Sequence, residues 1–160
     1  MMDELPEAAR RVQQVLTDRG SLAKVLLLPQ TTATAQEAAK AVGVPVAYIG
    51  KSIVFATENQ VAVAVVRGDQ RVDSALLAQA LGAVQAKTLR ADEVRRRTGY
   101  VIGGVSPFGL PSDIEVVVDA DLEAFEWCYV AAGHPMAVVR VDRDELVAAS
   151  NAKVSSIATR

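Results

Sequence analysis

Two apolar segments joined by a short polar turn constrain the fold of this chain more than any other feature. Residues 52–57 and 61–66 have the β-branched and apolar content of strands, and Glu58-Asn59-Gln60 between them predicts a hairpin. The second segment, Val-Ala-Val-Ala-Val-Val, has no polar residue on either face, which is typical of a strand that is covered on both sides. We therefore expect this hairpin to be central in a sheet or barrel.

The remaining sequence alternates between helical and extended patterns. Helices are expected over residues 6–19, 34–43, 73–81 and 92–97, and from residue 142 onward. Further strands are expected over residues 25–28, 114–118, 127–132 and 136–141, which gives roughly six or seven strands in all. The last ten residues are expected to form a frayed tail. Together these patterns predict one α/β domain over residues 1–160, with a mixed, partly antiparallel, barrel-like sheet surrounded by helices.

Charge and cysteine content exclude several classes of protein. With 17 Lys and Arg against 19 Asp and Glu, the formal net charge is −2, so no basic field over the whole surface attracts polyanions. Cys128 has no partner for an internal disulfide, and no Cys/His cluster has the spacing of a zinc site, so we expect a reducing compartment and no metal or cofactor. The acidic N-terminus and the interrupted apolar stretches predict a cytoplasmic protein without a membrane span.

Two segments are candidates for a functional site. Lys51 precedes the apolar strand at 52–57, so its ammonium group starts from a strand end, where loops gather and a phosphate can be held. The alternative is a solvated lysine that discourages strand pairing at a sheet edge. The segment 99–111 contains four glycines and two prolines, and its glycines allow backbone groups to approach a ligand. The alternative for this segment is an ordinary turn between strands.

Other reactive side chains are interpreted as structural. His134, the only histidine, is expected to be solvated in a loop, and a catalytic triad with Ser106 is disfavoured because Ser106 precedes Pro107 outside a nucleophile elbow. Cys128 lies between aromatic residues in an apolar run and is expected to be an inert core residue. Asp113 and Asp119 flank the strand at 114–118 and are left without an assigned role: they could orient another group, but acidic residues at strand ends are usually only solvated.

Taken in order, several motifs resemble those of a known family. They are Ile49-Gly50-Lys51-Ser52-Ile53-Val54-Phe55, then Arg67-Gly68-Asp69, then Gly103-Gly104-Val105-Ser106-Pro107-Phe108-Gly109, and then Gly133-His134. Over residues 24–150 this order resembles the YbaK/ProX family of freestanding aminoacyl-tRNA deacylases, which is similar to the editing domain of bacterial prolyl-tRNA synthetases. The resemblance implies a mixed α/β fold around a barrel-like sheet, and metal-free hydrolysis of the ester that joins a wrong amino acid to tRNA.

The resemblance also implies roles for individual residues. The positions implied to act in catalysis are Lys51, expected to hold the terminal adenosine or its phosphate, and the backbone of Gly103, Gly104, Val105, Ser106 and Pro107. The positions implied to bind the substrate are Ile49, Phe108, Gly133 and His134. Water, assisted by the free hydroxyl of the terminal ribose, would attack the ester while loop amides stabilise the developing oxyanion.

The substrate implied by the resemblance is tRNA(Pro) that carries alanine, cysteine or another small amino acid, with prolyl-tRNA synthetase as a candidate partner. One methylene is worth only about 1 to 3 kcal/mol in a pocket, so the sequence does not separate neighbouring small amino acids. A basic pair of some cysteine-acting members is absent after Gly133, where His134-Pro135 stands, and this argues against cysteine specificity. The alternatives are a noncatalytic module that binds aminoacyl-tRNA or a synthetase, and a domain that binds a small molecule or peptide.

Segregated charge indicates where tRNA would dock. Residues 84–100 carry five Lys or Arg side chains against two acidic ones, whereas residues 111–127 carry six acidic side chains and no basic one. Arg95, Arg96 and Arg97 are therefore candidates for contacts with the acceptor end of tRNA. The alternative is a solvated helix face.

Overall fold

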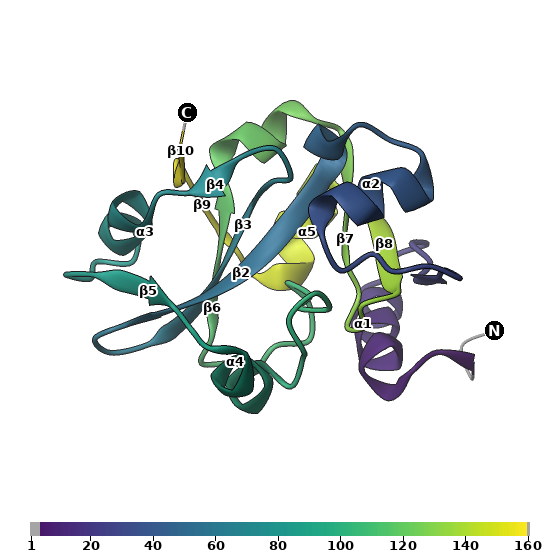
Figure 1. Ribbon diagram of the computed structural model, residues 1–160, viewed down its shortest axis with the longest axis horizontal. Helices are drawn as coiled ribbons and strands as arrows, with labels where there is room; N and C mark the ends of the chain where they lie inside the picture. The colour runs from purple at the N-terminus through teal and green to yellow at the C-terminus, as the bar shows by residue number, and fades with distance from the viewer. Residues whose placement is uncertain (1–3, 160) are drawn as a thin grey trace.

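The computed structural model describes residues 4–159 (Figure 1). Its helices are α1 (Glu7–Asp18), α2 (Ala35–Val42), α3 (Ser74–Ala80), α4 (Ala91–Thr98) and α5 (Arg143–Ser150), with 3₁₀ turns η2 (Val46–Tyr48) and η3 (Ala120–Ala124). Its strands are β1 (Leu26–Leu27), β2 (Ile49–Thr57), β3 (Val61–Arg67), β4 (Arg71–Val72), β5 (Ala86–Thr88), β6 (Glu115–Asp119), β7 (Trp127–Ala131), β8 (Ala137–Asp142), β9 (Lys153–Ser155) and β10 (Ala158–Thr159). Every helix in this part of the chain is too short or too polar to cross a membrane.

The predicted hairpin, β2 with β3, lies at the centre of a mixed sheet. The strands of this sheet follow the order β1-β8-β7-β2-β3-β6-β9, and β5 pairs with β2 beside this path. The pairs β1–β8, β8–β7, β2–β3 and β2–β5 are antiparallel, whereas β7–β2, β3–β6 and β6–β9 are parallel. A separate two-stranded sheet joins β4 to β10. The predicted α/β class with a mixed, partly antiparallel sheet is confirmed.

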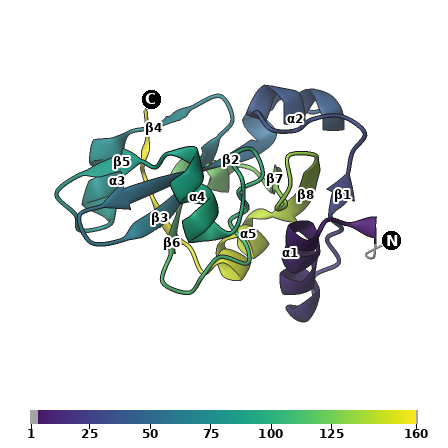
Figure 2. The ribbon, with the colours of Figure 1, turned by 60° about the horizontal axis from the view of Figure 1, so that its bottom comes forward.

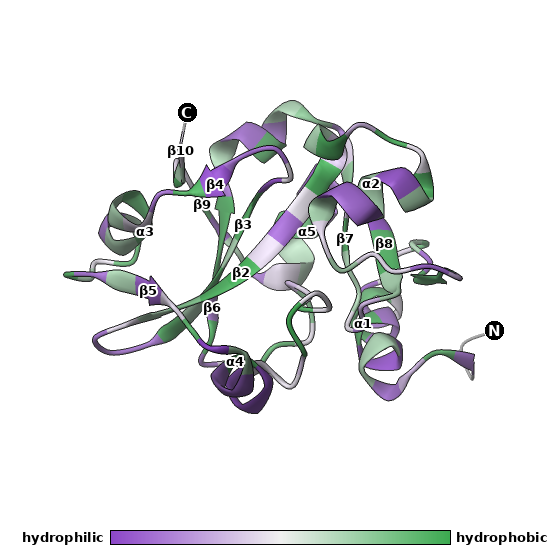
Figure 3. Cartoon of the chain, in the orientation of Figure 1, coloured by the Kyte–Doolittle hydropathy of each residue, from purple (hydrophilic) through white to green (hydrophobic). Residues whose placement is uncertain are grey.

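Both faces of β3 are buried, as its uniformly apolar sequence predicts. Val63 and Val65 belong to a core cluster that α1 completes with Val12, whereas Ala64 and Val66 belong to a second cluster on the other face. Figures 1 and 2 show helices on several sides of the sheet, with α2 beside β7 and β8 and α3 near β4 and β5 at the opposite end. Hydrophobic residues concentrate in the strands and hydrophilic residues on α4 (Figure 3). The central hairpin is therefore a rigid support.

The ends of α2 follow from local sequence as predicted. The Thr34 hydroxyl accepts a hydrogen bond from the Glu37 amide at 3.1 Å, and the Glu37 carboxylate accepts one from the Thr34 amide at 3.1 Å. This reciprocal capping box satisfies two donors that a helix start leaves without partners. Gly43 ends the helix in the left-handed conformation, at φ 75°. The capping box fixes the direction in which α2 leaves the preceding loop.

The C-terminal segment contradicts the prediction of a frayed tail. Its β9 strand pairs in parallel with β6, and β10 pairs with β4. Ile157 is fully buried between these two strands. The Ile157 and Ala158 amides donate to one carboxylate oxygen of Asp119, at 2.8 and 3.0 Å. Asp119, which the sequence leaves without an assigned role, is also fully buried. The prediction failed because these strands are two and three residues long and their partners lie far away in sequence.

The middle of β2 has hydrogen bonds to a neighbouring strand on one side only. On that side β3 pairs with β2 from Gly50 to Ala56. On the other side, β7 pairs with Ile49 and Gly50, and β5 pairs with residues 55–57. The Val54 carbonyl also accepts a hydrogen bond from the Leu89 amide on this side, at 3.2 Å. Residues 51–53 therefore lie in a break between β7 and β5, which we call the open edge of β2. This break places a stretch of strand backbone beside the loop that leads from α4 to β6.

Replacement of Asp119 tests its role in holding the C-terminal strands. Asp119→Ala leaves two buried amide donors without their acceptor, and we expect the free energy of unfolding to fall by about 2 to 4 kcal/mol. Urea denaturation followed by circular dichroism measures this change. The matched control is Asp113→Ala, because Asp113 is exposed and its loss should change stability by less than about 0.5 kcal/mol. Equal effects of the two replacements would contradict the assignment.

Candidate functional site

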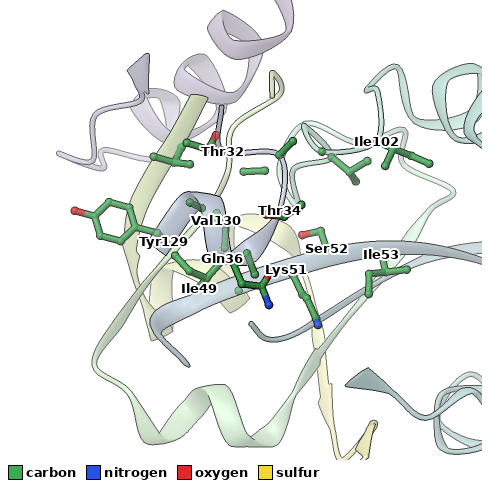
Figure 4. A pocket seen from close by; sticks show the side chains of 18 residues that line it. Thr32, Thr34, Gln36, Ile49, Lys51, Ser52, Ile53, Ile102, Tyr129 and Val130 are labelled. Carbon is green, nitrogen blue, oxygen red and sulfur yellow. The ribbon is translucent and has the colours of Figure 1, made fainter. Parts of the chain in front are cut away.

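Two adjoining cavities meet at the open edge of β2. The larger cavity, of about 320 Å³, lies between α2, β2, β7 and the loop after α4 (Figure 4). The smaller cavity, of about 230 Å³, lies between β2, β5, α4 and the same loop. The walls that the two cavities share are Ser52, Ile53, Ile102, Gly103 and Val105. A ligand with two chemically different parts could place one part in each cavity. The bond that joins the two parts would then lie at the shared wall.

Lys51 is the cation of the larger cavity. The structure corrects its predicted position, because β2 begins at Ile49 and Lys51 is the third residue of the strand rather than a residue before it. Burial lowers the pKa of the Lys51 ammonium group, the positive charge of Arg71 lowers it further, and Asp69 opposes the shift. Within residues 4–159, Lys51 has no ion pair with a carboxylate. An anionic ligand group would therefore supply a counter-charge to a partly desolvated ammonium group.

Asp69, the acid that favours the charged form of Lys51, is already engaged by an arginine. The Arg67 guanidinium donates two hydrogen bonds to Asp69, with its Nε at 2.9 Å and its Nη2 at 2.6 Å from the two carboxylate oxygens. These hydrogen bonds lower the pKa of Asp69 and hold it in the charged form. The bidentate pair fixes the Asp69 carboxylate toward Arg67. Lys51 is consequently left available for a ligand.

The glycine-rich loop approaches two other segments closely. A Cβ atom on Gly103 would lie 2.9 Å from the Ala33 Cβ, and one on Gly104 would lie 2.9 Å from the backbone of His134. The Gly104 carbonyl also accepts a hydrogen bond from the Gly133 amide at 2.9 Å. These positions require glycine because the neighbouring backbone occupies the space of a side chain. The loop is thereby held against the cavity wall.

The structure brings only part of the predicted site into the cavity. Of the residues expected to act in catalysis or substrate binding, Ile49, Lys51, Gly103 and Val105 line the larger cavity. Phe108 is fully buried in the main core cluster, and Ser106, also fully buried, accepts a hydrogen bond from the Phe108 amide at 3.3 Å. The predicted contact of Phe108 with substrate does not fit this position. Pro107 borders a different surface hollow.

Gly133 and His134 lie behind the loop rather than on the cavity wall. The Gly133 amide donates a hydrogen bond to the Gly104 carbonyl. His134 Nδ1 accepts a hydrogen bond from the Met136 amide at 3.0 Å. Neither residue lines the larger cavity. Their backbone packs against the glycine-rich loop at Gly104.

Cys128 is an inert core residue, as predicted. It is 3% exposed, and burial raises the pKa of its thiol to about 12. A thiol with this pKa is almost entirely protonated at neutral pH, so it lacks the thiolate that nucleophilic catalysis needs.

The basic helix α4 borders the smaller cavity. Its Val94 is part of the cavity wall, whereas Arg95, Arg96 and Arg97 are on its outer surface. Arg96 pairs with Glu93 on the same helix, and Arg97 lies 4.0 Å from Asp113. Exposed pairs of this kind contribute little energy, so these guanidinium groups can exchange partners for phosphates.

Sequence reasoning missed the residues that α2 and its preceding loop bring to the cavity. These are Thr32, Ala33, Thr34, Ala35, Gln36 and Ala38. The capping box at Thr34 was readable as a helix start but gave no sign that the helix faces β2. Ser52 and Tyr129 were also missed, because a serine at the start of an apolar strand and a tyrosine beside a buried cysteine are common in cores.

Comparisons with known proteins show which family and which fold this chain is similar to. A family model described as an aminoacyl-tRNA editing domain matches residues 29–149. The YwhH protein of Bacillus subtilis (strain 168) is 37% identical over 125 residues, which cover 78% of this chain and 79% of YwhH. A crystal structure described as a candidate trans-editing enzyme for prolyl-tRNA synthetase superposes with a TM-score of 0.89 at 37% identity, covering 98% of this chain and all of that one.

A proline–tRNA ligase is also similar over part of its length. The enzyme of Pelotomaculum thermopropionicum is 35% identical over 82 residues, which are 51% of this chain and 14% of the ligase. The chain thus spans about a seventh of that ligase.

Alanine at position 104 tests the close approach of the loop to residue 134. Gly104→Ala must move the loop or the His134 backbone, and we expect destabilisation by about 1 to 3 kcal/mol with shifted amide resonances from residue 102 to residue 106. Thermal unfolding and two-dimensional NMR spectra measure both effects. The control is Gly82→Ala, which has an open site and positive φ, and should cost about 1 kcal/mol without shifting those resonances. Unshifted loop resonances in Gly104→Ala would contradict the close contact.

Proposed function

The chain belongs to the family of aminoacyl-tRNA editing domains, and from this membership we propose that it is a trans-editing deacylase that hydrolyses the ester of mischarged tRNA. The proposed substrate is tRNA(Pro) that carries alanine, cysteine or another small amino acid. The proposed catalytic groups are Lys51 and the backbone of residues 103–107. The proposed unit of function is a single domain over residues 1–160.

The observation that carries this proposal is the pairing of one available ammonium group with a backbone loop across a cavity. Lys51 and Gly103 both line the larger cavity, and Lys51 has no carboxylate partner in the described part of the chain. A phosphate or ribose oxygen of the terminal adenosine would be held by the Lys51 ammonium group. The ester would then lie near the loop, where the Gly104 amide already donates to the Val101 carbonyl and the Gly103 and Val105 amides would be the donors.

This geometry supports hydrolysis without a side-chain nucleophile. A water oxygen bonds to the ester carbonyl carbon, the bond from that carbon to the ribose oxygen breaks, and the leaving ribose oxygen takes up a proton. The neighbouring ribose hydroxyl orients the water, and loop amides stabilise negative charge on the carbonyl oxygen. One such donor is worth about 3 kcal/mol in the transition state. An activated ester needs positioning more than it needs a strong nucleophile.

The size of the cavity supports a small amino acid. Three alanines, Ala33, Ala35 and Ala38, line it from the side of α2, and Ile49 and Val138 close its far wall. The similarity to part of a proline–tRNA ligase supports proline tRNA as the carrier. The family resemblance implies that His134 binds the substrate. In this proposal His134 acts instead by supporting the glycine-rich loop.

Deacylation assays test the proposal directly. The protein is incubated with tRNA(Pro) charged with alanine, cysteine or serine, and loss of the ester is followed over time. We expect hydrolysis of at least one substrate, and a fall in kcat/KM of about 100-fold in Lys51→Ala, because a charged hydrogen bond is lost. Lys24→Ala is the matched control, since Lys24 is exposed before β1 and lines neither cavity, and it should leave the rate unchanged.

Three outcomes of this assay are distinct. Absence of ester loss on every substrate would contradict a deacylase. Binding of charged tRNA that survives Lys51→Ala without turnover would favour a noncatalytic module. Equal rates for Lys51→Ala and wild type would remove Lys51 from the mechanism.

Replacement of the α4 arginines tests the docking surface for the acceptor end. Changing Arg95, Arg96 and Arg97 to Gln should raise KM for charged tRNA about tenfold, with kcat retained, because phosphate contacts are lost and the chemistry is not. The dependence of KM on salt should also become flatter. Both KM and its salt dependence are measured with an aminoacylated RNA minihelix of the acceptor stem, over a series of salt concentrations. Unchanged KM and salt dependence would identify this face as solvated surface only.

A further inference from the structure

The open edge of β2 presents unpaired backbone groups to both cavities. The Gly68 amide donates to the Ile49 carbonyl at 2.7 Å, and the Thr57 amide donates to the Gln60 carbonyl at 2.8 Å, so odd-numbered residues of β2 bond to the β3 side. Even-numbered residues direct their amide and carbonyl groups to the opposite edge, as the bond from the Leu89 amide to the Val54 carbonyl at 3.2 Å confirms.

Ser52 is the even-numbered residue of β2 that has no hydrogen-bonded neighbour across this edge within residues 4–159, since Val54 accepts from the Leu89 amide. Gly50 pairs with β7, and Ala56 pairs with β5, whereas Ser52 pairs with neither. Within residues 4–159, the Ser52 amide and carbonyl form no hydrogen bond across this edge. Its side-chain hydroxyl is also buried without a partner. Burying polar groups without hydrogen-bond partners costs free energy. A ligand that supplies partners for the Ser52 backbone and hydroxyl would remove this cost.

Ser52 also lies at the junction of the two cavities. It lines both of them, opposite Gly103 and Val105. Figure 4 shows its hydroxyl on the side of Thr34 and Ile102, while the Lys51 ammonium group leaves β2 in another direction. Ser52 therefore faces the place where the ester of a bound substrate would lie, separate from the cation.

An aminoacyl group is the chemical complement of this edge. Its α-amino group is an N–H donor and its carbonyl is an acceptor, in the same covalent relation as in one residue of a strand. Two residues that face each other in a hydrogen-bonded antiparallel pair exchange both N–H to O bonds. A single aminoacyl residue can therefore pair with the backbone of Ser52 as a strand would, which is strand addition on the smallest scale.

We propose that the aminoacyl group of the substrate binds the open edge of β2 as a one-residue strand, donating its α-amino N–H to the Ser52 carbonyl and accepting from the Ser52 amide at its ester carbonyl. This inference rests on the proposed deacylase function and adds a recognition mode to it. The Ser52 amide becomes a positioning and oxyanion donor beside the glycine-rich loop. Because the bonds use only backbone atoms, they recognise the α-amino acid ester itself and leave the choice of side chain to the cavity walls.

The substrate-side test compares alanyl-tRNA(Pro) with propionyl-tRNA(Pro), which is identical except that it lacks the α-amino group. Each enzymatic kcat/KM is divided by the rate of spontaneous hydrolysis of the same ester, because the amino group also activates the ester chemically. We expect the normalised value to be about 10-fold to 100-fold lower for the propionyl ester. Equal normalised values would overturn the pairing.

The protein-side test removes the Ser52 amide alone. Ser52→Ala is compared with a protein that carries the α-hydroxy analogue of alanine at position 52, so that an ester replaces the amide and the side chain is the same. We expect the ester variant to have a kcat about 100-fold below that of Ser52→Ala, the size of effect seen when one oxyanion donor is removed. Thermal unfolding should be similar in the two proteins, because this amide has no partner in the fold.

The same amide-to-ester exchange at Leu22 is the control, since Leu22 is 90% exposed and lies outside both cavities. It should not change kcat. An ester variant at position 52 with the activity of Ser52→Ala would overturn the proposal. Failure of the wild type to hydrolyse any charged tRNA would instead overturn the proposed function, so the two failures are distinguishable.

Discussion

The break in the pairing of β2 is the constraint on which the site depends. β3 holds the full length of β2 on one side, and both faces of β3 are buried. On the other side, β7 covers only the first two residues of β2 and β5 only the last three. A strand that is fixed along one edge and uncovered along the other presents rigid backbone donors and acceptors. The cavities, Lys51 and the glycine-rich loop are all arranged around this uncovered edge.

The electrostatics of the site follow from which charges are already paired. Asp69 is the acid that most favours the charged form of Lys51, yet its carboxylate is held by two hydrogen bonds from Arg67. Burial and Arg71 both act against the Lys51 charge. An anionic group of a ligand relieves this cost, because it adds the opposite charge in a partly desolvated place. Asp119, from the acidic segment 111–127, is directed inward instead, where it accepts hydrogen bonds from the C-terminal amides of Ile157 and Ala158.

Local sequence signals predicted the elements but not their long-range partners. The capping box at Thr34 and the uninterrupted apolar run of β3 depend on adjacent residues, so both were predicted correctly. The strands at the C-terminus depend on Asp119, which lies 38 residues before Ile157, and a two-residue strand has no periodicity to detect. The same limit applies to the site. Phe108 and Ser106 stand in a functional motif, but the fold turns both into the core.

The sequence by itself determined the class of the fold and the central hairpin, and the resemblance of its ordered motifs indicated the family. The fold class and the hairpin follow from composition and periodicity, which depend on residues close together in the chain. Only the tertiary structure decided that α2 faces β2, that His134 supports the loop from behind, and that the backbone of Ser52 is uncovered. An uncovered edge is a place where a neighbouring strand is missing, and the residues of β2 give no local signal of this. It arises because β7 and β5, which lie far apart in the sequence, each stop short of the middle of the same strand.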